Sequence, residues 1–155
     1  MRQSEHNAGV RMAEERFVIT QFCDDIRQEI GNKVSLMGCY GPSMLVGALP
    51  VVLPKLCVHV RIYTPIDRPF SRLSVRLMCE KELLGEMQFP QEDALPAELP
   101  NTHHRPHAKW WMRATVIALS PFPVEKPCRL SVEADTEEGV ISGQSFWIEQ
   151  APPSN

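Results

Sequence analysis

Alternation of apolar and polar residues is the clearest pattern in this sequence. Every second residue from Leu56 to Ile62 is leucine, valine or isoleucine, and a similar period recurs from Leu73 to Cys79. A period of two places alternate side chains on opposite faces of a β-strand. We therefore predict strands over residues 55–64 and 71–80, each with one apolar face toward a core.

Further short apolar segments predict strands along the rest of the chain. Their ranges are 16–23, 33–40, 43–48, 83–89, 110–120, 128–134 and 140–149. Glycines, prolines and acidic residues separate these segments, as is typical of turns. The 14 prolines among 155 residues agree with this interpretation, because proline is excluded from helix interiors and from central strands.

The pattern as a whole predicts an all-β protein with eight or nine short strands and no long helix. Two antiparallel sheets can bury their apolar faces against each other, so we expect an immunoglobulin-like or fibronectin-like β-sandwich. A closed barrel has the same local pattern and is the alternative. The length fits one domain over residues 12–150, followed by a tail at 151–155.

The first eleven residues are polar and show no period. We predict a mobile N-terminal tail, with Met12 as an alternative true start. No apolar signal-peptide core is visible there, which favours a cytoplasmic protein. Residues 34–53 are nearly uncharged, but their glycines and prolines do not suit a membrane helix, so no membrane contact is expected.

Charge and cysteine content exclude several function classes. Lysine and arginine number 16 against 19 aspartates and glutamates, and no basic run occurs, so nucleic-acid binding is not expected. The number of cysteines is odd and none forms a CxxC pair, so we expect reduced, mostly buried thiols and no cofactor. The five cysteines are Cys23, Cys39, Cys57, Cys79 and Cys128.

An acidic segment follows the first predicted strand and is expected to form a turn over residues 24–30. It contains Asp24, Asp25, Arg27 and Glu29. These carboxylates are the chemistry of a cation site or of acid–base catalysis. The alternative is a capping turn with local hydrogen bonds between aspartate and arginine. A third hypothesis is that the turn binds a partner.

The segment 90–109 is predicted to be a long loop that contains His103, His104 and His107. Three imidazoles are weak candidates for a metal site. Pro106 breaks any helix that would align His103 with His107, so a solvated loop is the alternative.

Tryptophans supply the candidate interaction residues. Trp111 and Arg113 share one face of their predicted strand, and we place that face outside the core. Trp147 is also expected outside, because Phe146 and Ile148 fit the core better. Exposed tryptophan and arginine often anchor interfaces. The alternative for Trp111 is that the loop 90–109 covers it.

The front of the chain resembles an uncharacterised bacterial family of small single-domain proteins with an immunoglobulin-like sandwich. The resemblance rests on FVITQFCDDIRQEIGNKVSLMGCYG and on LPVVLPKLCVHVRIYTP. The family pattern is CDDIR-E followed by K-SL-G-Y. The resemblance implies a bacterial cytosolic sandwich in which the acidic segment is a hallmark, and it implies no substrate or cofactor.

No pattern pairs a nucleophile with a base, and no phosphate-binding glycine loop occurs in the sequence. An enzyme is therefore uncertain, with the balance against one. The preferred hypothesis is a non-enzymatic interaction or structural module that binds an unknown protein or a second copy of itself. The alternative is a metal-binding or hydrolytic protein that uses the histidine loop.

Overall fold

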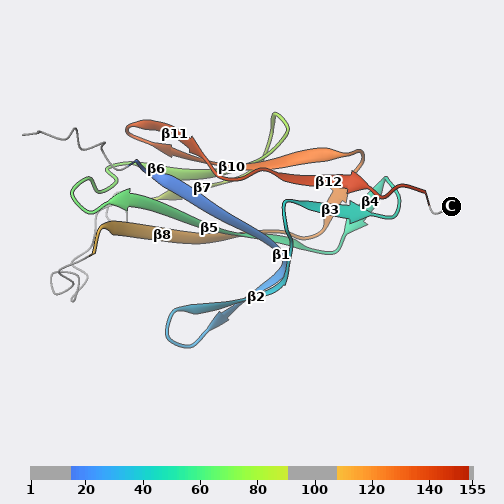
Figure 1. Cartoon of the computed structure of the whole chain (residues 1–155), viewed down its shortest axis with the longest axis horizontal. Coiled ribbons are helices and arrows are strands. Elements are labelled where there is room, and N and C mark those ends of the chain that lie inside the picture. The colour runs from blue at the N-terminus through green and yellow to red at the C-terminus, as the bar shows by residue number, and fades with distance from the viewer. Residues whose placement is uncertain (1–14, 91–107, 154–155) are drawn as a thin grey trace, which may run out of the picture.

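The computed structural model describes residues 15–90 and 108–153, and these residues form strands joined by turns (Figure 1). No helix occurs among them. The all-β class predicted from the sequence is confirmed. The strands are β1 (Phe17–Glu29), β2 (Lys33–Cys39), β3 (Ser43–Val46), β4 (Val51–Leu53), β5 (Leu56–Pro65), β6 (Leu73–Cys79), β7 (Glu82–Phe89), β8 (Trp110–Leu119), β9 (Phe122–Val124), β10 (Cys128–Thr136), β11 (Gly139–Ser142) and β12 (Phe146–Gln150).

Two main sheets form the two layers of the molecule (Figure 1). The first has the order β2-β1-β5-β8. The second has the order β3-β12-β10-β6-β7, and β11 also pairs with β10. Strands β4 and β9 form a separate two-stranded ribbon. All pairs are antiparallel except β3 and β12, which are parallel and depart from the purely antiparallel arrangement that we predicted.

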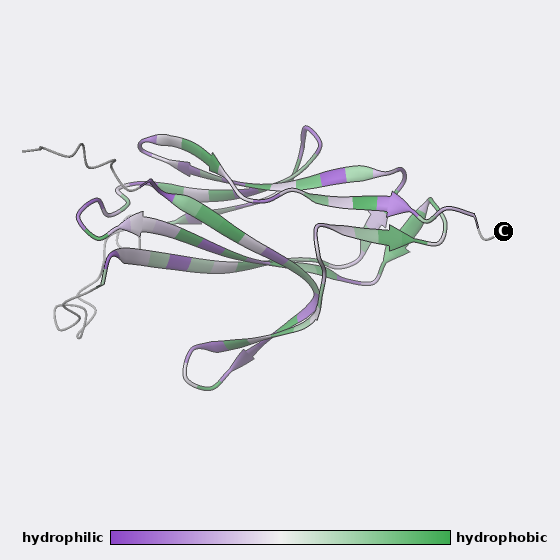
Figure 2. Ribbon diagram, in the orientation of Figure 1, coloured by the Kyte–Doolittle hydropathy of each residue, from purple (hydrophilic) through white to green (hydrophobic). Residues whose placement is uncertain are grey.

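The core lies between the inner faces of the two sheets. Val60 and Ile62 of β5 are buried with Val75 of β6 and Leu130 of β10, and hydropathy alternates along β5 and β6 as predicted (Figure 2). Phe146 is also fully buried, and burying a side chain of that size contributes roughly 2–3 kcal/mol. The alternating segments therefore identified the inner faces of β5 and β6 correctly.

The described residues contain twelve strands, three more than the nine ranges predicted. Prolines hid β4 and β9, which pair with each other outside the main sheets, where proline is tolerated. The last predicted strand is divided into β11 and β12 around Gly143. An added Cβ at Gly143 would lie 2.6 Å from Thr20 Cγ2, so glycine is required for the close approach of β1.

The acidic segment is not a turn, and this prediction was wrong. Residues 24–29 continue β1, which spans 13 residues and pairs with β2 along this whole segment. The sequence suggested a break because aspartate is rare in strands. Here Asp24 accepts a hydrogen bond from Tyr40, and Asp25 accepts one from Lys55. Both contacts come from other strands or turns, so a local pattern could not show them.

A buried arginine joins the two sheets at the start of β1. The Arg16 side chain is 3% exposed and forms an ion pair with Glu137, in the turn between β10 and β11. Its guanidinium donates to Thr64 Oγ1 at 2.9 Å and to the Arg68 carbonyl at 3.1 Å. It also lies over the Phe70 ring, 4.6 Å from the centroid. One side chain thus connects three separate segments.

Candidate interaction surface

A two-stranded arm, residues 24–38, extends from the body of the sandwich. Strand β1 pairs with β5 only as far as Cys23, and beyond that point it pairs with β2 alone. Figure 1 shows this hairpin leaving the two layers. Its tip is formed by Gly31 and Asn32, whose φ angles of 81° and 56° suit glycine and asparagine.

The arm has one apolar and one polar face. Ile26 lies opposite Leu36 across the two strands, and Val34 shares their face. These three side chains are half-buried. On the polar face, Ser35 Oγ donates to Glu29 Oε1 at 2.9 Å. The Ile30 side chain at the tip is 94% exposed. An apolar surface is therefore carried away from the core.

Aspartates fix the base of the arm. The Tyr40 hydroxyl donates to Asp24, and the Lys55 ammonium group donates to Asp25. Burial, the hydrogen bond to Asp24 and the charge of Asp24 raise the pKa of Tyr40 to about 12. The hydrogen bonds from Lys55 and from the Ile26 amide lower the pKa of the Asp25 carboxyl. Each aspartate thus has a partner outside the arm or at its base.

The predicted carboxylates do not converge on one site. Alternation along β1 places Asp24 on one face and Asp25 and Glu29 on the other. Within residues 15–90 and 108–153, no group of three or more histidine, cysteine, aspartate or glutamate side chains is arranged to hold a metal ion. The geometry therefore supports a contact surface better than a shared cation or acid–base site.

The predicted register of β8 was wrong. Met112 and Ala114 are exposed on the outer face, whereas Ile117 and Leu119 pack against the core. Trp111 and Arg113 lie on the same face of β8 as Ile117 and Leu119, which is the inner face, and both are half-buried. The Trp111 indole N–H donates a hydrogen bond to the Ile66 carbonyl at 3.2 Å. Both faces of this segment carry apolar residues, so alternation alone could not choose between them.

Trp147 lies outside the core, as predicted. It is 46% exposed, whereas Phe146 and Ile148 on either side are buried. The guanidinium carbon of Arg129 lies 5.9 Å from the centroid of the Trp147 ring, a separation typical of a cation–π contact. Trp147 therefore remains a candidate contact residue on the second sheet.

Aromatic residues also gather on the outer face of the first sheet. The Phe17 ring stacks on Tyr63 with centroids 4.6 Å apart, and it meets Trp110 edge-on at 5.0 Å. The sequence pattern placed Trp110 on the core face, because it shares parity with Met112, Ala114, Val116 and Ala118. The cross-strand position of Tyr63 opposite Phe17 instead provides an aromatic neighbour at the surface.

His59 gives the fold a pH dependence near neutrality. Burial and the charge of Arg61 lower the pKa of His59 below 6.5. The unfolded chain therefore binds more protons than the folded chain as pH falls through 6.5, and stability is lost in that window. We expect urea denaturation to show a larger loss of stability from pH 7.5 to 5.5 in the wild type than in His59→Gln. Equal losses in the two proteins would contradict this assignment.

The histidine loop and the N-terminal tail fall largely outside the described residues. Strand β7 ends at Phe89 and β8 begins at Trp110, and the loop predicted between them stays a prediction. His103, His104 and His107 lie in the segment 91–107, and residues 1–11 precede the first described residue. Among the described residues, no helix is long and apolar enough to cross a membrane.

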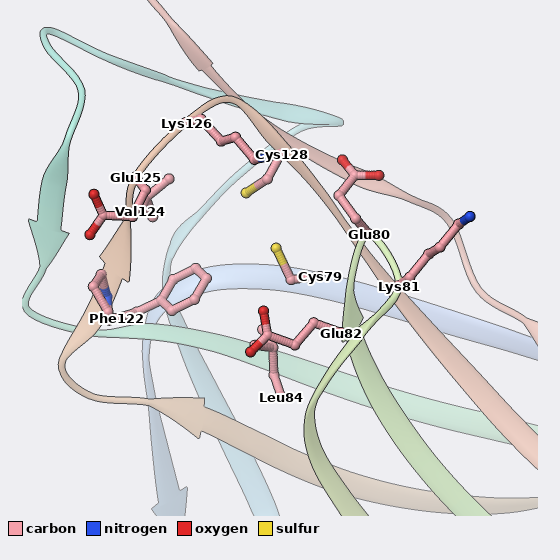
Figure 3. A pocket seen from close by; sticks show the side chains of 11 residues that line it. Cys79, Glu80, Lys81, Glu82, Leu84, Phe122, Val124, Glu125, Lys126 and Cys128 are labelled. Carbon is pink, nitrogen blue, oxygen red and sulfur yellow. The ribbon is translucent and has the colours of Figure 1, made fainter.

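A pocket with two cysteines was not predicted from the sequence. Cys79, the last residue of β6, and Cys128, the first of β10, line an open pocket of about 610 Å³ (Figure 3). Phe122 and Leu84 form part of its apolar wall. The two cysteines are 49 positions apart in the sequence, so only the pairing of β6 with β10 brings them together.

The other three cysteines form a row across the first sheet. Cys23 lies opposite Cys39 on one side and opposite Cys57 on the other. Cys23 and Cys57 are buried, as predicted, whereas Cys39 is exposed. Burial and the neighbouring thiols raise the pKa of Cys23 to about 11, so its thiol stays protonated at neutral pH. All five cysteines are free thiols in this structure.

No protein family, curated protein or solved structure matches this chain in our comparisons. The resemblance to a bacterial family therefore stays a prediction, as does the immunoglobulin-like topology.

Proposed function

We propose that this protein is a non-enzymatic interaction module whose arm binds a protein partner. The observation that carries this proposal is that residues 24–38 leave the sandwich as a two-stranded hairpin with an exposed isoleucine at the tip. A surface loop that only joined two strands would need neither an extended hairpin nor an apolar tip. The same segment carries the family resemblance in the sequence.

Physical reasons favour binding by this arm. A two-stranded hairpin is at best marginally stable without further packing, so a partner that covers Ile26, Val34 and Leu36 would stabilise it. The polar face supplies charges of both signs, Arg27 and Glu29 among them, which can orient a partner. Beyond Asp25, the outer edge of β1 has no strand paired with it in the described part of the chain. This edge can accept a strand.

Residues outside the arm contribute to the proposal unequally. Trp147 is exposed and can serve as a second contact, whereas Trp111 and Arg113 are half-buried and present less surface. We further propose a cytoplasmic location, with the partner either another protein or a second copy of this chain. The metal-binding or hydrolytic alternative depends on His103, His104 and His107, and no described residue favours it over the arm.

Substituting the tip of the arm tests the proposal. Ile30→Asp should leave the fold unchanged, because the side chain is almost wholly exposed. We expect wild-type protein to capture a defined partner from a lysate of its host, or to form a dimer by light scattering. Ile30→Asp should lose at least about tenfold in either association, because a desolvated charge is unfavourable in an apolar interface.

Val140→Asp is the matched control. Val140 lies in β11 and is 52% exposed. Its substitution by aspartate therefore adds the same charge as Ile30→Asp at another exposed apolar position. Association that is lost in Ile30→Asp and kept in Val140→Asp supports the arm. The proposal is abandoned if both variants associate like wild type, or if wild-type protein is monomeric and captures nothing.

A further inference from the structure

The thiols of Cys79 and Cys128 face each other across the pocket in Figure 3. Cys79 lies opposite Leu130, and Cys128 is two residues earlier on the same face of β10. The two cysteines are therefore diagonal neighbours on adjacent strands. The neighbouring Cys79 thiol is one cause of the raised pKa of Cys128, which agrees with their proximity. The two thiols thus lie in the same pocket and point toward each other (Figure 3).

From this juxtaposition we infer a thiol–disulfide exchange site, at which Cys79 and Cys128 react reversibly with a small disulfide. The reaction begins when the Cys79 thiolate attacks one sulfur of the small disulfide. A mixed disulfide forms on Cys79, and the first small thiolate leaves and takes up the proton that Cys79 lost. Cys128 then loses its proton, attacks the Cys79 sulfur and releases the second small thiol. The protein is oxidised by two electrons, and one small disulfide is reduced to two thiols.

The surroundings assign different roles to the two cysteines. Cys79 is half-buried and Cys128 is buried, so an incoming reagent reaches Cys79 first. Burial and the neighbouring Cys79 thiol raise the pKa of Cys128 to about 12, so Cys128 is a neutral thiol at rest and passes its proton to the second small thiolate as it attacks the mixed disulfide. Cys79 is therefore the attacking group and Cys128 the resolving one.

The local backbone keeps the two cysteines together. The Glu80 amide donates to the Arg129 carbonyl at 2.9 Å, and Glu80 Oε1 accepts from the Arg129 amide at 2.8 Å. Glu80 has a φ of 52°, an uncommon conformation for a glutamate, which this double contact maintains. Because both cysteines lie at strand ends, their backbones can adjust to the Cα separation that a disulfide needs.

The pocket suits a small charged disulfide. Its volume of about 610 Å³ lies within the range of small-molecule sites. Lys81 and Lys126 line it together with Glu80 and Glu82, so both signs of charge are present. A disulfide such as oxidised glutathione, which carries carboxylates and ammonium groups, complements this lining. Cys23 and Cys57 are fully buried and line no such opening among the described pockets.

Peptide mapping can test this site, because trypsin places each of the five cysteines on its own peptide. Cys79 falls in Leu77–Lys81 and Cys128 in Ala114–Arg129, since the bond between Lys126 and Pro127 resists cleavage. Folded full-length protein is incubated with oxidised glutathione, quenched with acid, alkylated and digested. We expect these two peptides to be linked by a disulfide with the loss of two hydrogens, and we expect reduced glutathione to reverse the link.

Two variants distinguish the roles of the cysteines. Cys128→Ser should lose the linked pair and accumulate glutathione on Cys79, because no resolving thiol remains. Cys79→Ser should lose the linked pair and leave Cys128 largely unmodified. The proposal is overturned if folded wild-type protein forms no link between these peptides, or if other cysteine pairs are linked equally well. Glutathione that accumulates equally on Cys79 in wild type and in Cys128→Ser would also overturn it.

Discussion

Replacing Arg16 by alanine is expected to lower the free energy of unfolding by about 3 kcal/mol. Breaking a buried ion pair costs roughly 3–5 kcal/mol. We take the lower end of that range because the Glu137 side chain is partly exposed, which weakens the ion pair. The substitution removes the donor to Thr64 Oγ1 and to the carbonyls of Arg68 and Pro69. It also leaves Glu137 without its guanidinium partner. Urea denaturation followed by tryptophan fluorescence measures the loss.

The pH dependence of this effect has a definite sign. Burial alone would raise the pKa of Glu137, but hydrogen bonds from Arg16 and from backbone amides, with the charge of Arg16, lower it from 4.5 to about 2. A carboxyl group whose pKa is lowered by folding stabilises the protein above pH 4.5, and this stabilisation is lost as the pH falls toward 2. The difference in free energy of unfolding between wild type and Arg16→Ala should therefore become smaller as the pH is lowered from 7 to 3.

Arg72→Ala is the matched control for Arg16→Ala. Arg72 also forms an ion pair, with Asp135 at 3.1 Å, but its side chain is largely exposed. Exposed pairs contribute less than about 1 kcal/mol. If Arg16→Ala and Arg72→Ala were equally stable, Arg16 would not connect the two sheets as described.

Gly38→Ala is expected to destabilise the base of the arm by about 2 kcal/mol, from an unfavourable φ and a lost hydrogen bond. Gly38 has a φ of 63°, and an added Cβ would lie 2.0 Å from Asp24 Oδ2 and 2.6 Å from its Cγ. The whole Asp24 side chain must move, which separates it from the Tyr40 hydroxyl. Hydrogen exchange should show faster exchange of amides in residues 24–38, and partner capture should weaken with it.

Gly41→Ala provides the comparison for Gly38→Ala. No heavy atom lies within 4 Å of a Cβ built at Gly41, and its φ is outside the left-handed region. This variant should retain wild-type exchange in the arm. Equal protection of the arm amides in both variants would show that Asp24 does not depend on glycine at position 38.

The sequence predicted best those strands whose two faces differ in polarity. In β5 and β6 one face is mainly apolar and the other mainly polar, so alternation identified the inward residues correctly. In β8 both parities carry apolar residues, because its outer face is partly aromatic, and the predicted register was reversed. A single strand contains no information about which of two apolar faces meets the other sheet.

The candidate sites depended on contacts that sequence spacing does not encode. The sequence singled out Asp24 and Asp25, but their hydrogen-bond partners Tyr40 and Lys55 come from other elements. The pair of Cys79 and Cys128 was missed because no short motif joins two cysteines so far apart. Sheet order, which the local pattern leaves open, decides both arrangements.

The parallel pairing of β3 with β12 has a consequence for folding during synthesis. Ser43 pairs with Trp147, so the two strands are about a hundred residues apart in the chain. Closing so long a loop is entropically costly and slows folding. During synthesis on the ribosome, β3 stays unpaired until β12 emerges. We therefore expect the second sheet to close late, after most of the first sheet has been synthesised.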